Sequence, residues 1–160
     1  MKIRPGTTED HPFLEEMLFE AIFWNPTTAK PNMNDFFKET KLNRFLSNWG
    51  RPGDISFIAE KGGVPIGAAW YRLFTAEEGS YGFVDENTPE IGMAISKNHR
   101  SQGIGRELLR SLISEAQREG FESLSLSVDP ANFALKLYES EGFFKVGESG
   151  TSWTLLRKLK

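Results

Sequence analysis

The chain has 160 residues, of which 39% are hydrophobic and 26% charged, a composition typical of a globular domain. It contains no cysteine and two histidines, which argues against disulfides, a catalytic thiolate and a histidine-rich metal site. The net charge of −3 argues against nucleic acid as the main partner, and no apolar stretch is long enough to suggest a membrane span. We therefore expect a cytoplasmic protein in which residues 1–160 form a single domain.

Strand and helix patterns alternate along the first half of the chain. Apolar side chains recur at helical spacing after Asp10, and again in a segment that includes Phe36 and Leu42. From Ile55 onward a strand pattern takes over, and Gly62-Gly63 favours a tight hairpin turn. The elements predicted here are a strand at 2–4, a helix after 10, a helix at about 34–48, strands at 55–59 and 64–74, and an acidic loop at 76–88.

The second half of the chain continues this alternation. A strand is predicted at residues 90–96, and a long helix follows Gly105 and ends at Gly120. The apolar face of this helix contains Leu108, Leu109, Leu112, Ile113 and Ala116. A strand at 124–128, a helix at 131–140 and strands at 143–147 and 152–159 complete the chain. The resulting order, β-α-α-β-β-β-α-β-α-β-β, predicts an α/β domain in which helices pack on a mixed sheet.

The segment Arg100-Ser101-Gln102-Gly103-Ile104-Gly105 lies between a predicted strand and a predicted helix. Glycines at alternate positions allow a sharp bend, and the free N–H groups and dipole at a helix start favour an anion such as pyrophosphate. A tight turn that serves packing only would have the same pattern. The third glycine of a Rossmann loop and the lysine of a Walker loop are both missing. The basic residues around the segment, opposed by Glu107 only, are Lys97, His99, Arg100, Arg106 and Arg110.

Two motifs with the expected order and spacing resemble the GNAT family of N-acetyltransferases. The segment from Arg100 to Arg106 is similar to the acetyl-CoA motif of that family, Arg/Gln-x-x-Gly-x-Gly/Ala. Residues 132–143, which include Asn132 and Tyr138, resemble its second motif. The resemblance covers roughly residues 88–148 and implies a GNAT-type acyl-CoA N-acyltransferase fold, with about seven strands in a mixed sheet and about four helices.

The resemblance also implies how acetyl-CoA binds as co-substrate. The strands at 90–96 and 124–128 are expected to splay apart, with the pantetheine arm between them. Backbone groups on the first strand, and N–H groups between Gln102 and Arg106, are expected to hold the arm and the pyrophosphate. No metal is expected. The expected cofactor-binding residues are Met93, Ala94, Ile95, Arg100, Ser101, Gln102, Gly103, Ile104, Gly105, Arg106 and Asn132.

The family resemblance assigns Tyr138 the role of protonating the departing thiolate, for which a phenol with a pKa of ~10 is suited. The same residue also fits a purely structural role on an amphipathic helix. Glu90 is the candidate general base, or alternatively a solvated charge at a strand end. Glu20 is a second candidate base. The acidic loop at 76–88 either steers a cationic amine toward the site or is simply solvated.

Together these features predict an N-acetyltransferase that uses direct attack by a primary amine in a ternary complex. The acceptor is expected to be a small molecule, a peptide or a protein amine, with neither nucleic acid nor membrane as a partner. Monomer and homodimer are both open. A non-catalytic acyl-CoA-binding module and the same fold with another acyl donor are the alternatives. Residues 7–50 and 74–88, where the family builds its acceptor sites, have no signature that identifies the amine.

Overall fold

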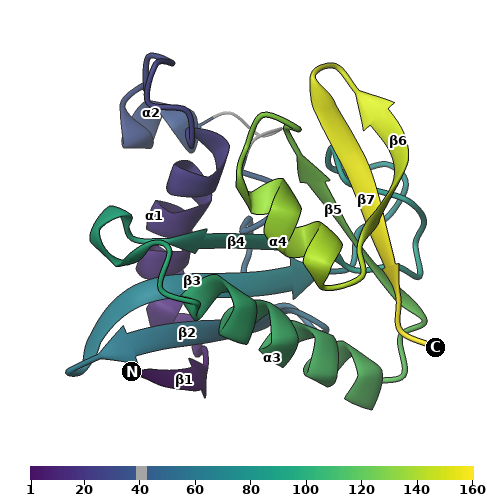
Figure 1. The fold of residues 1–160 in the computed structure, drawn as a ribbon, viewed down its shortest axis with the longest axis horizontal. Coiled ribbons are helices and arrows are strands. Elements are labelled where there is room, and N and C mark those ends of the chain that lie inside the picture. Colours follow the sequence, from purple (N-terminus) through teal and green to yellow (C-terminus); the bar gives the residue numbers. More distant parts are fainter. Residues whose placement is uncertain (39–42) are drawn as a thin grey trace.

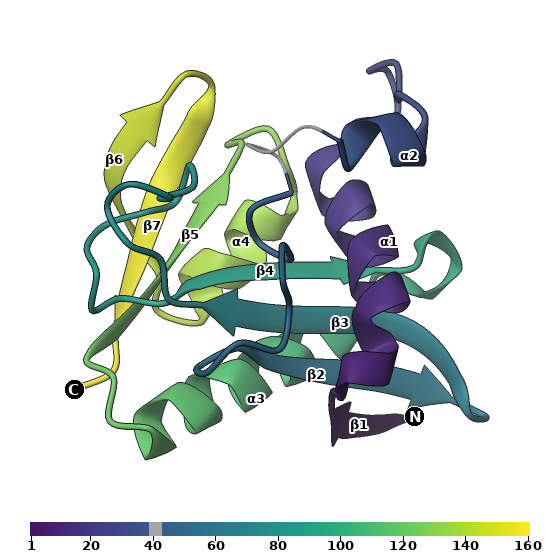
Figure 2. The same cartoon turned by 180° about the vertical axis from the view of Figure 1, so that it is seen from behind.

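The computed structural model describes residues 1–38 and 43–160 and contains a mixed sheet of seven strands (Figure 1). The strand order is β1-β2-β3-β4-β5-β7-β6, in which β4 and β5 are parallel neighbours. Helices α3 and α4 cover one face of the sheet, and α1 and α2 lie on the other (Figure 2). The bounds are β1 Lys2–Pro5, α1 His11–Ile22, α2 Met33–Phe36, β2 Ile55–Lys61, β3 Val64–Arg72, β4 Glu90–Ile95, α3 Ile104–Arg118, β5 Ser123–Val128, α4 Ala134–Ser140, β6 Phe144–Ser149 and β7 Ser152–Lys158.

The predicted order of strands and helices is confirmed. Gly62 and Gly63 have φ angles of 60° and 78°, the left-handed values that a two-residue hairpin turn requires. Gly120 has a φ angle of 88° just beyond the end of α3, as predicted for a helix-terminating glycine. The predicted apolar face of α3 is confirmed as buried, and its residues are Leu108, Leu109, Leu112, Ile113 and Ala116.

The prediction of one helix at about 34–48 is wrong in extent. Helix α2 is a single turn of four residues, and residues 44–50 form turns. Leu42 lies outside the described residues. A tertiary contact explains part of the difference, because the backbone carbonyls of Arg44 and Ser47 accept hydrogen bonds from the buried guanidinium of Arg72. Those carbonyls would otherwise accept bonds within a helix.

The sheet has a separate apolar core on each face. Helix α3 packs on one face, where Leu108 and Leu112 lie against residues of the sheet such as Leu126. Helix α1 packs on the other face, where Leu14 and Leu18 contact a cluster that includes Trp70. The strands between the two cores are therefore packed on both faces, and side chains on them are well placed to form a site.

No helix among the described residues is both long and apolar enough to cross a bilayer.

Strands β4 and β5 pair at one position and then diverge, as the expected splay requires. The pair is Glu90 and Ser125, and the Ser125 N–H donates to the Pro89 carbonyl at 3.0 Å. Gly82, from the loop before β4, lies against this junction. A Cβ atom on Gly82 would come within 2.7 Å of the Leu126 carbonyl carbon and 2.9 Å of Glu90 Oε2. Only a residue without a side chain fits there without displacing the strand.

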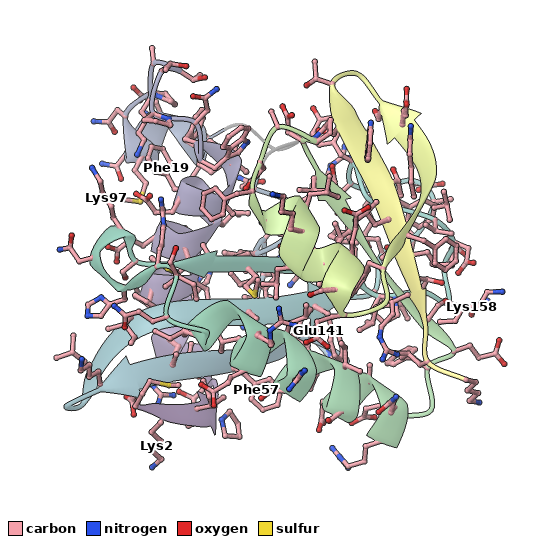
Figure 3. All side chains as sticks on the ribbon, in the orientation of Figure 1. Lys2, Phe19, Phe57, Lys97, Glu141 and Lys158 are labelled. Atoms are coloured by element: carbon pink, nitrogen blue, oxygen red, sulfur yellow. The ribbon has the colours of Figure 1, made fainter. Side chains whose placement is uncertain are left out.

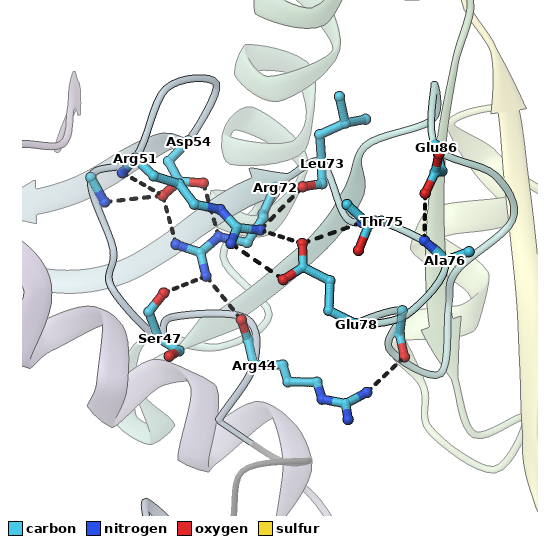
Figure 4. A network of polar contacts seen from close by, with 12 residues as sticks. Arg44, Ser47, Arg51, Asp54, Arg72, Leu73, Thr75, Ala76, Glu78 and Glu86 are labelled. Atoms are coloured by element: carbon cyan, nitrogen blue, oxygen red, sulfur yellow. Dashed lines mark hydrogen bonds and ion pairs between the residues drawn. The ribbon is translucent and has the colours of Figure 1, made fainter.

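A buried arginine on β3 ties the segment before β2 to the sheet (Figure 4). Arg72 is 1% exposed, and its Nε and Nη2 donate to the two carboxylate oxygens of Asp54 at 2.9 and 2.7 Å. Its Nη1 donates to the carbonyls of Arg44 and Ser47 at 2.9 and 2.6 Å. Because each nitrogen of the guanidinium has an oxygen partner, its buried charge is well compensated.

A second arginine extends this network to the loop after β3 (Figure 4). Arg51 forms an ion pair with Glu78, at 3.0 Å between Nη2 and Oε1, and also donates to the Leu73 carbonyl. Arg44 Nη1 donates to the Gly79 carbonyl at 3.2 Å. The segment at 43–54 and the loop at 73–89 are therefore held to each other as well as to β3.

Replacing Asp54 with alanine should destabilise the fold strongly. The substitution leaves the Arg72 charge buried without its carboxylate, and removing one member of a buried pair typically costs about 3–5 kcal/mol. Chemical denaturation should show a loss of this size in the free energy of unfolding. Asp35→Ala is the matched control, because the Asp35–Lys38 pair is exposed and worth less than about 1 kcal/mol. Equal effects of the two substitutions would contradict the assigned role of Arg72.

Candidate active site

A cleft of about 670 Å³ opens where β4 and β5 part. Its walls come from the end of α1, from β4, from the loop before α3, from the end of β5 and from α4. The cleft brings together twelve of the thirteen predicted site residues, and Gln102 is the exception. The twelve are Glu90, Met93, Ala94, Ile95, Arg100, Ser101, Gly103, Ile104, Gly105, Arg106, Asn132 and Tyr138.

The two glycines of the loop before α3 serve different purposes. Gly103 is left-handed, with a φ angle of 83°, and so is Ser101, with 61°. No side chain among the described residues caps the start of α3, so the first N–H groups of this helix have no side-chain acceptor. Gly105 instead allows close packing, since a Cβ there would lie 3.2 Å from Leu137 Cδ2 and 3.4 Å from Met93 Cε. The loop thus combines open space at Gly103 with a tight contact of Gly105 to α4 and β4.

The basic cluster near this loop is more strongly opposed than the sequence predicted. Glu141, at the end of α4, accepts from Arg106 at 2.6 Å and from Arg110 at 2.9 Å, and Figure 3 shows it between α4 and α3. Burial raises the pKa of Glu141, but hydrogen bonds from the two arginines outweigh it and hold that pKa below its usual value. Arg100 contacts Glu20 at 3.4 Å. The prediction that Glu107 alone opposes the cluster is therefore wrong.

Glu90 is buried at the apex of the cleft, with 1% of its surface exposed. The N–H of Gly82 donates to its Oε2 at 3.2 Å, while Oε1 has no hydrogen-bond partner among the described residues. Burial raises the pKa of Glu90 to about 8, although the hydrogen bond from Gly82 favours the charged form. The alternative reading of Glu90 as a solvated strand-end charge is therefore wrong.

Tyr138 lies on α4 and lines the same cleft, with 7% of its surface exposed. Its ring packs edge-on against Phe143 at 5.9 Å between centroids, so it also belongs to the core beneath α4. Burial raises the pKa of Tyr138 to about 12, so the phenol stays protonated near neutral pH. Its position satisfies both of the roles that the sequence left open.

Asn132 and His99 both line the cleft, and both have side-chain polar atoms without a hydrogen-bond partner among the described residues. Asn132 Oδ1 accepts from the N–H of Ala134 at 3.0 Å at the start of α4, which leaves the amide NH₂ for other contacts. His99 is half-buried, and its Nδ1 has no partner within residues 1–38 and 43–160. Across these same residues, no group of three or more His, Asp or Glu side chains is placed to hold a metal ion.

The carboxylates of the acidic loop hold the loop itself rather than face the cleft. Glu78 pairs with Arg51, and Glu86 accepts from the N–H of Ala76 at 2.7 Å. Asp85 accepts from the N–H of Asn87 and the hydroxyl of Thr88. None of these carboxylates, nor that of Glu77, lines the cleft. The solvated interpretation of this loop therefore fits the structure better than steering of a cationic amine.

Several cleft residues have no signature in the sequence. Trp70 comes from β3, Phe45 from the segment at 43–54, and Tyr81 from the loop at 73–89. The indole N–H of Trp70 is buried without a hydrogen-bond partner in the described part of the chain. These side chains line one cleft only because distant segments come together in the fold, which no local pattern indicates.

The amino-acid sequence of this chain is similar to those of known acetyltransferases. The family model described as "Acetyltransferase (GNAT) family" matches residues 16–143. Mycothiol acetyltransferase of Thermobispora bispora is 29% identical over 126 residues, which are 78% of this chain and 39% of that protein. The chain spans less than half of the length of this relative and of the next curated relatives.

Solved structures of acetyltransferases have the same fold as this chain. The ribosomal-protein-alanine N-acetyltransferase from Brucella melitensis superposes with a TM-score of 0.71 at 24% identity, covering 99% of both chains. The PaiA N-acetyltransferase from Thermoplasma acidophilum, solved in complex with coenzyme A, has a TM-score of 0.73 at 17% identity and the same coverage. The seven-stranded mixed sheet with splayed β4 and β5 is thus the fold of these acetyltransferases. Because the family model matches most of this chain, residues 16–143, the chain belongs to the GNAT family of acetyltransferases.

Proposed function

We propose that this protein is an N-acetyltransferase that moves the acetyl group of acetyl-CoA to a primary amine. The observation that carries the proposal is that a single cleft is lined by the Gly103 loop, by Glu90 and by Tyr138. A binding module alone would need the loop but would have no use for a buried carboxyl group and a phenol beside it. We expect the enzyme to work in the cytoplasm. One continuous sheet across the described residues supports a single domain.

The donor would lie along the gap between β4 and β5. Backbone N–H groups from Gln102 to Arg106 would bind the pyrophosphate, helped by the positive end of the α3 dipole. Beyond Glu90, β4 has no strand partner on its β5 side, so Met93 and Ile95 have backbone groups available for the pantetheine amides. The amide NH₂ of Asn132 would contact the donor from the opposite wall.

Transfer would proceed by direct attack in a ternary complex. The amine nitrogen bonds to the thioester carbonyl carbon, and the backbone N–H of Met93, which faces the gap, stabilises the resulting oxyanion; the N–H of Ala94 faces β3 instead. The C–S bond then breaks, the amide product is released, and the thiolate receives a proton from Tyr138. The proton lost by the amine passes to Glu90, directly or through water. Glu20 is the weaker candidate for this base, because Arg100 and Lys30 already pair with it.

Gly103→Asp should weaken acetyl-CoA binding by about 100-fold, which corresponds to roughly 2.7 kcal/mol. The carboxylate would lie at the proposed pyrophosphate site and repel it. Calorimetry on the folded variant measures the effect. Gly103→Asn is the matched control, because it has the same size and the same strain at a φ angle of 83° but no charge, and should lose less affinity. Unchanged affinity in the aspartate variant would overturn the pyrophosphate assignment.

Tyr138→Phe should lower kcat by about 100-fold and leave the KM for acetyl-CoA nearly unchanged. The substitution removes the proposed proton donor but keeps the ring that packs on Phe143. Thiol release from acetyl-CoA in the presence of an amine measures the rate. Tyr71→Phe is the control, since Tyr71 is buried outside the cleft and its hydroxyl has no partner among the described residues. If both variants turn over like the wild type, Tyr138 has no part in proton transfer.

The pH dependence of kcat/KM should include a limb controlled by Glu90. A base must be ionised to accept a proton, and with a pKa of about 8 Glu90 is mostly neutral at pH 7. We expect kcat/KM to rise with pH until about pH 8. The Glu90→Gln variant should lose this limb and keep only the pH dependence that comes from deprotonation of the substrate amine. Identical pH profiles for wild type and variant would exclude Glu90 as the base.

The same carboxyl group should make stability fall with pH, whatever its catalytic role. The folded protein binds the Glu90 proton more tightly than the unfolded chain, where the pKa is near its ordinary value of 4.5. The stabilising effect of this proton is complete below about pH 4.5 and is lost as the pH rises to about 8. Thermal unfolding should therefore show that Glu90→Gln gains stability relative to wild type across this window. If the difference in stability between the variant and the wild type stays constant from pH 4.5 to 8, the pKa of Glu90 is not raised.

A further inference from the structure

Aromatic side chains form the wall of the cleft on the α1 face of β4. Phe23 and Trp24 come from the end of α1, Phe45 from the segment at 43–54, and Trp70 from β3. Phe45 meets Trp70 edge-on, at 6.2 Å between ring centroids. Phe23 and Trp24 are half-buried, so they are held in place and still present surface to the cleft. We refer to these four residues as the aromatic wall.

The aromatic wall lies next to the proposed reaction centre. Trp70 is paired with Gly92, two residues after Glu90, and alternate residues of a strand point to the same face. The Trp70 ring covers Gly92 so closely that a Cβ there would lie 2.6 Å from ring atoms. Trp70 is fully buried, so its ring supports the base of the wall and does not contact a substrate. The ring surface available to the rest of the amine comes from the half-buried Phe23, Trp24 and Phe45.

The carboxylates that line the cleft differ in how their charges are compensated. Besides Glu90, they belong to Glu20 and Asp129. Glu20, on α1, pairs with Arg100 at 3.4 Å and with Lys30 at 3.7 Å. Asp129, next to the end of β5, accepts the N–H of Ala131, a neutral donor that leaves its charge uncompensated. Glu90 itself is largely protonated near neutral pH. On the α1 side, the cleft lining among the described residues therefore offers no unpaired carboxylate to a second positive charge on a substrate.

The size of the cleft limits the part of the acceptor that it encloses. Its volume of about 670 Å³ also has to hold the acetyl group and the inner part of the pantetheine arm. The remaining space suits a compact apolar body next to the reacting amine, since whole small-molecule sites commonly occupy about 300–1,000 Å³.

We infer that the acceptor is a small primary monoamine with an aromatic or bulky apolar body, and that the aromatic wall binds this body. The inference rests on the proposed acetyl transfer and narrows it. A diamine or a basic peptide would have to bring a second ammonium group into an apolar site without a counter-ion, which is unfavourable. A monoamine brings only the group that is deprotonated before attack.

The test compares amines that differ in one property. Hexylamine and 1,6-diaminohexane have the same chain and differ in the second charge, and 2-phenylethylamine and an alanine-initiated peptide complete the set. We expect kcat/KM for 2-phenylethylamine and hexylamine to exceed that of the diamine and the peptide by at least about tenfold. A preference for the diamine or the peptide would overturn the inference and leave acetyl transfer intact. No transfer from bound acetyl-CoA to any of the four would refute the proposed function, and the inference with it.

Two wall variants test where the apolar body binds. Phe23→Leu and Trp24→Leu should each raise the KM for 2-phenylethylamine by about tenfold and leave the KM for acetyl-CoA unchanged. Phe13→Leu is the matched control, because Phe13 is a half-buried ring on the same helix that does not line the cleft. Calorimetric binding of 2-phenylethylamine in the presence of CoA gives a readout without turnover. Unchanged binding and KM in both wall variants would show that the aromatic wall does not contact the acceptor.

Discussion

Strands β4 and β5 are joined at one residue pair, Glu90 and Ser125, so the sheet has a gap in its interior rather than only at its edges. Backbone N–H and C=O groups beyond that pair lack the strand partner that neighbouring strands normally supply. The gap is kept open because Gly82 occupies its apex and β5 pairs with β7 on its other side. Every feature of the candidate site depends on this opening, since the cleft, the donor path and the walls all border it.

Burial at the apex of the gap also sets the chemistry of the two ionisable groups there. Glu90 and Tyr138 come from different elements, and both are buried where they line the cleft. Burial disfavours the charged form of each, which raises the pKa of Glu90 to about 8 and that of Tyr138 to about 12. In the proposed mechanism Glu90 can accept a proton once it is ionised, toward pH 8 and above, whereas Tyr138 keeps its proton. Such separation is what proton transfer in two directions requires.

The acceptor side of the cleft depends on a polar network some distance from the chemistry. Arg72 holds the segment at 43–54 through Asp54, and Arg51 holds the loop at 73–89 through Glu78. These two segments contribute Phe45 and Tyr81 to the cleft. The network positions aromatic side chains without facing the substrate itself. A buried ion pair in this role favours one conformation of loops that have little regular secondary structure of their own.

The sequence by itself determined the order of the elements, the turn at Gly62-Gly63, the buried face of α3 and the Gly103 loop, because each depends on spacing within a short segment. Only the tertiary structure decided the length of α2, the pairing of Glu141 with Arg106 and Arg110, and the burial of Glu90. Residues far apart in the chain create these features, as when Arg72 takes carbonyl groups that a longer helix would have used. Local patterns describe the proposed donor site, whereas the proposed acceptor site is assembled from distant segments whose contacts no local pattern specifies.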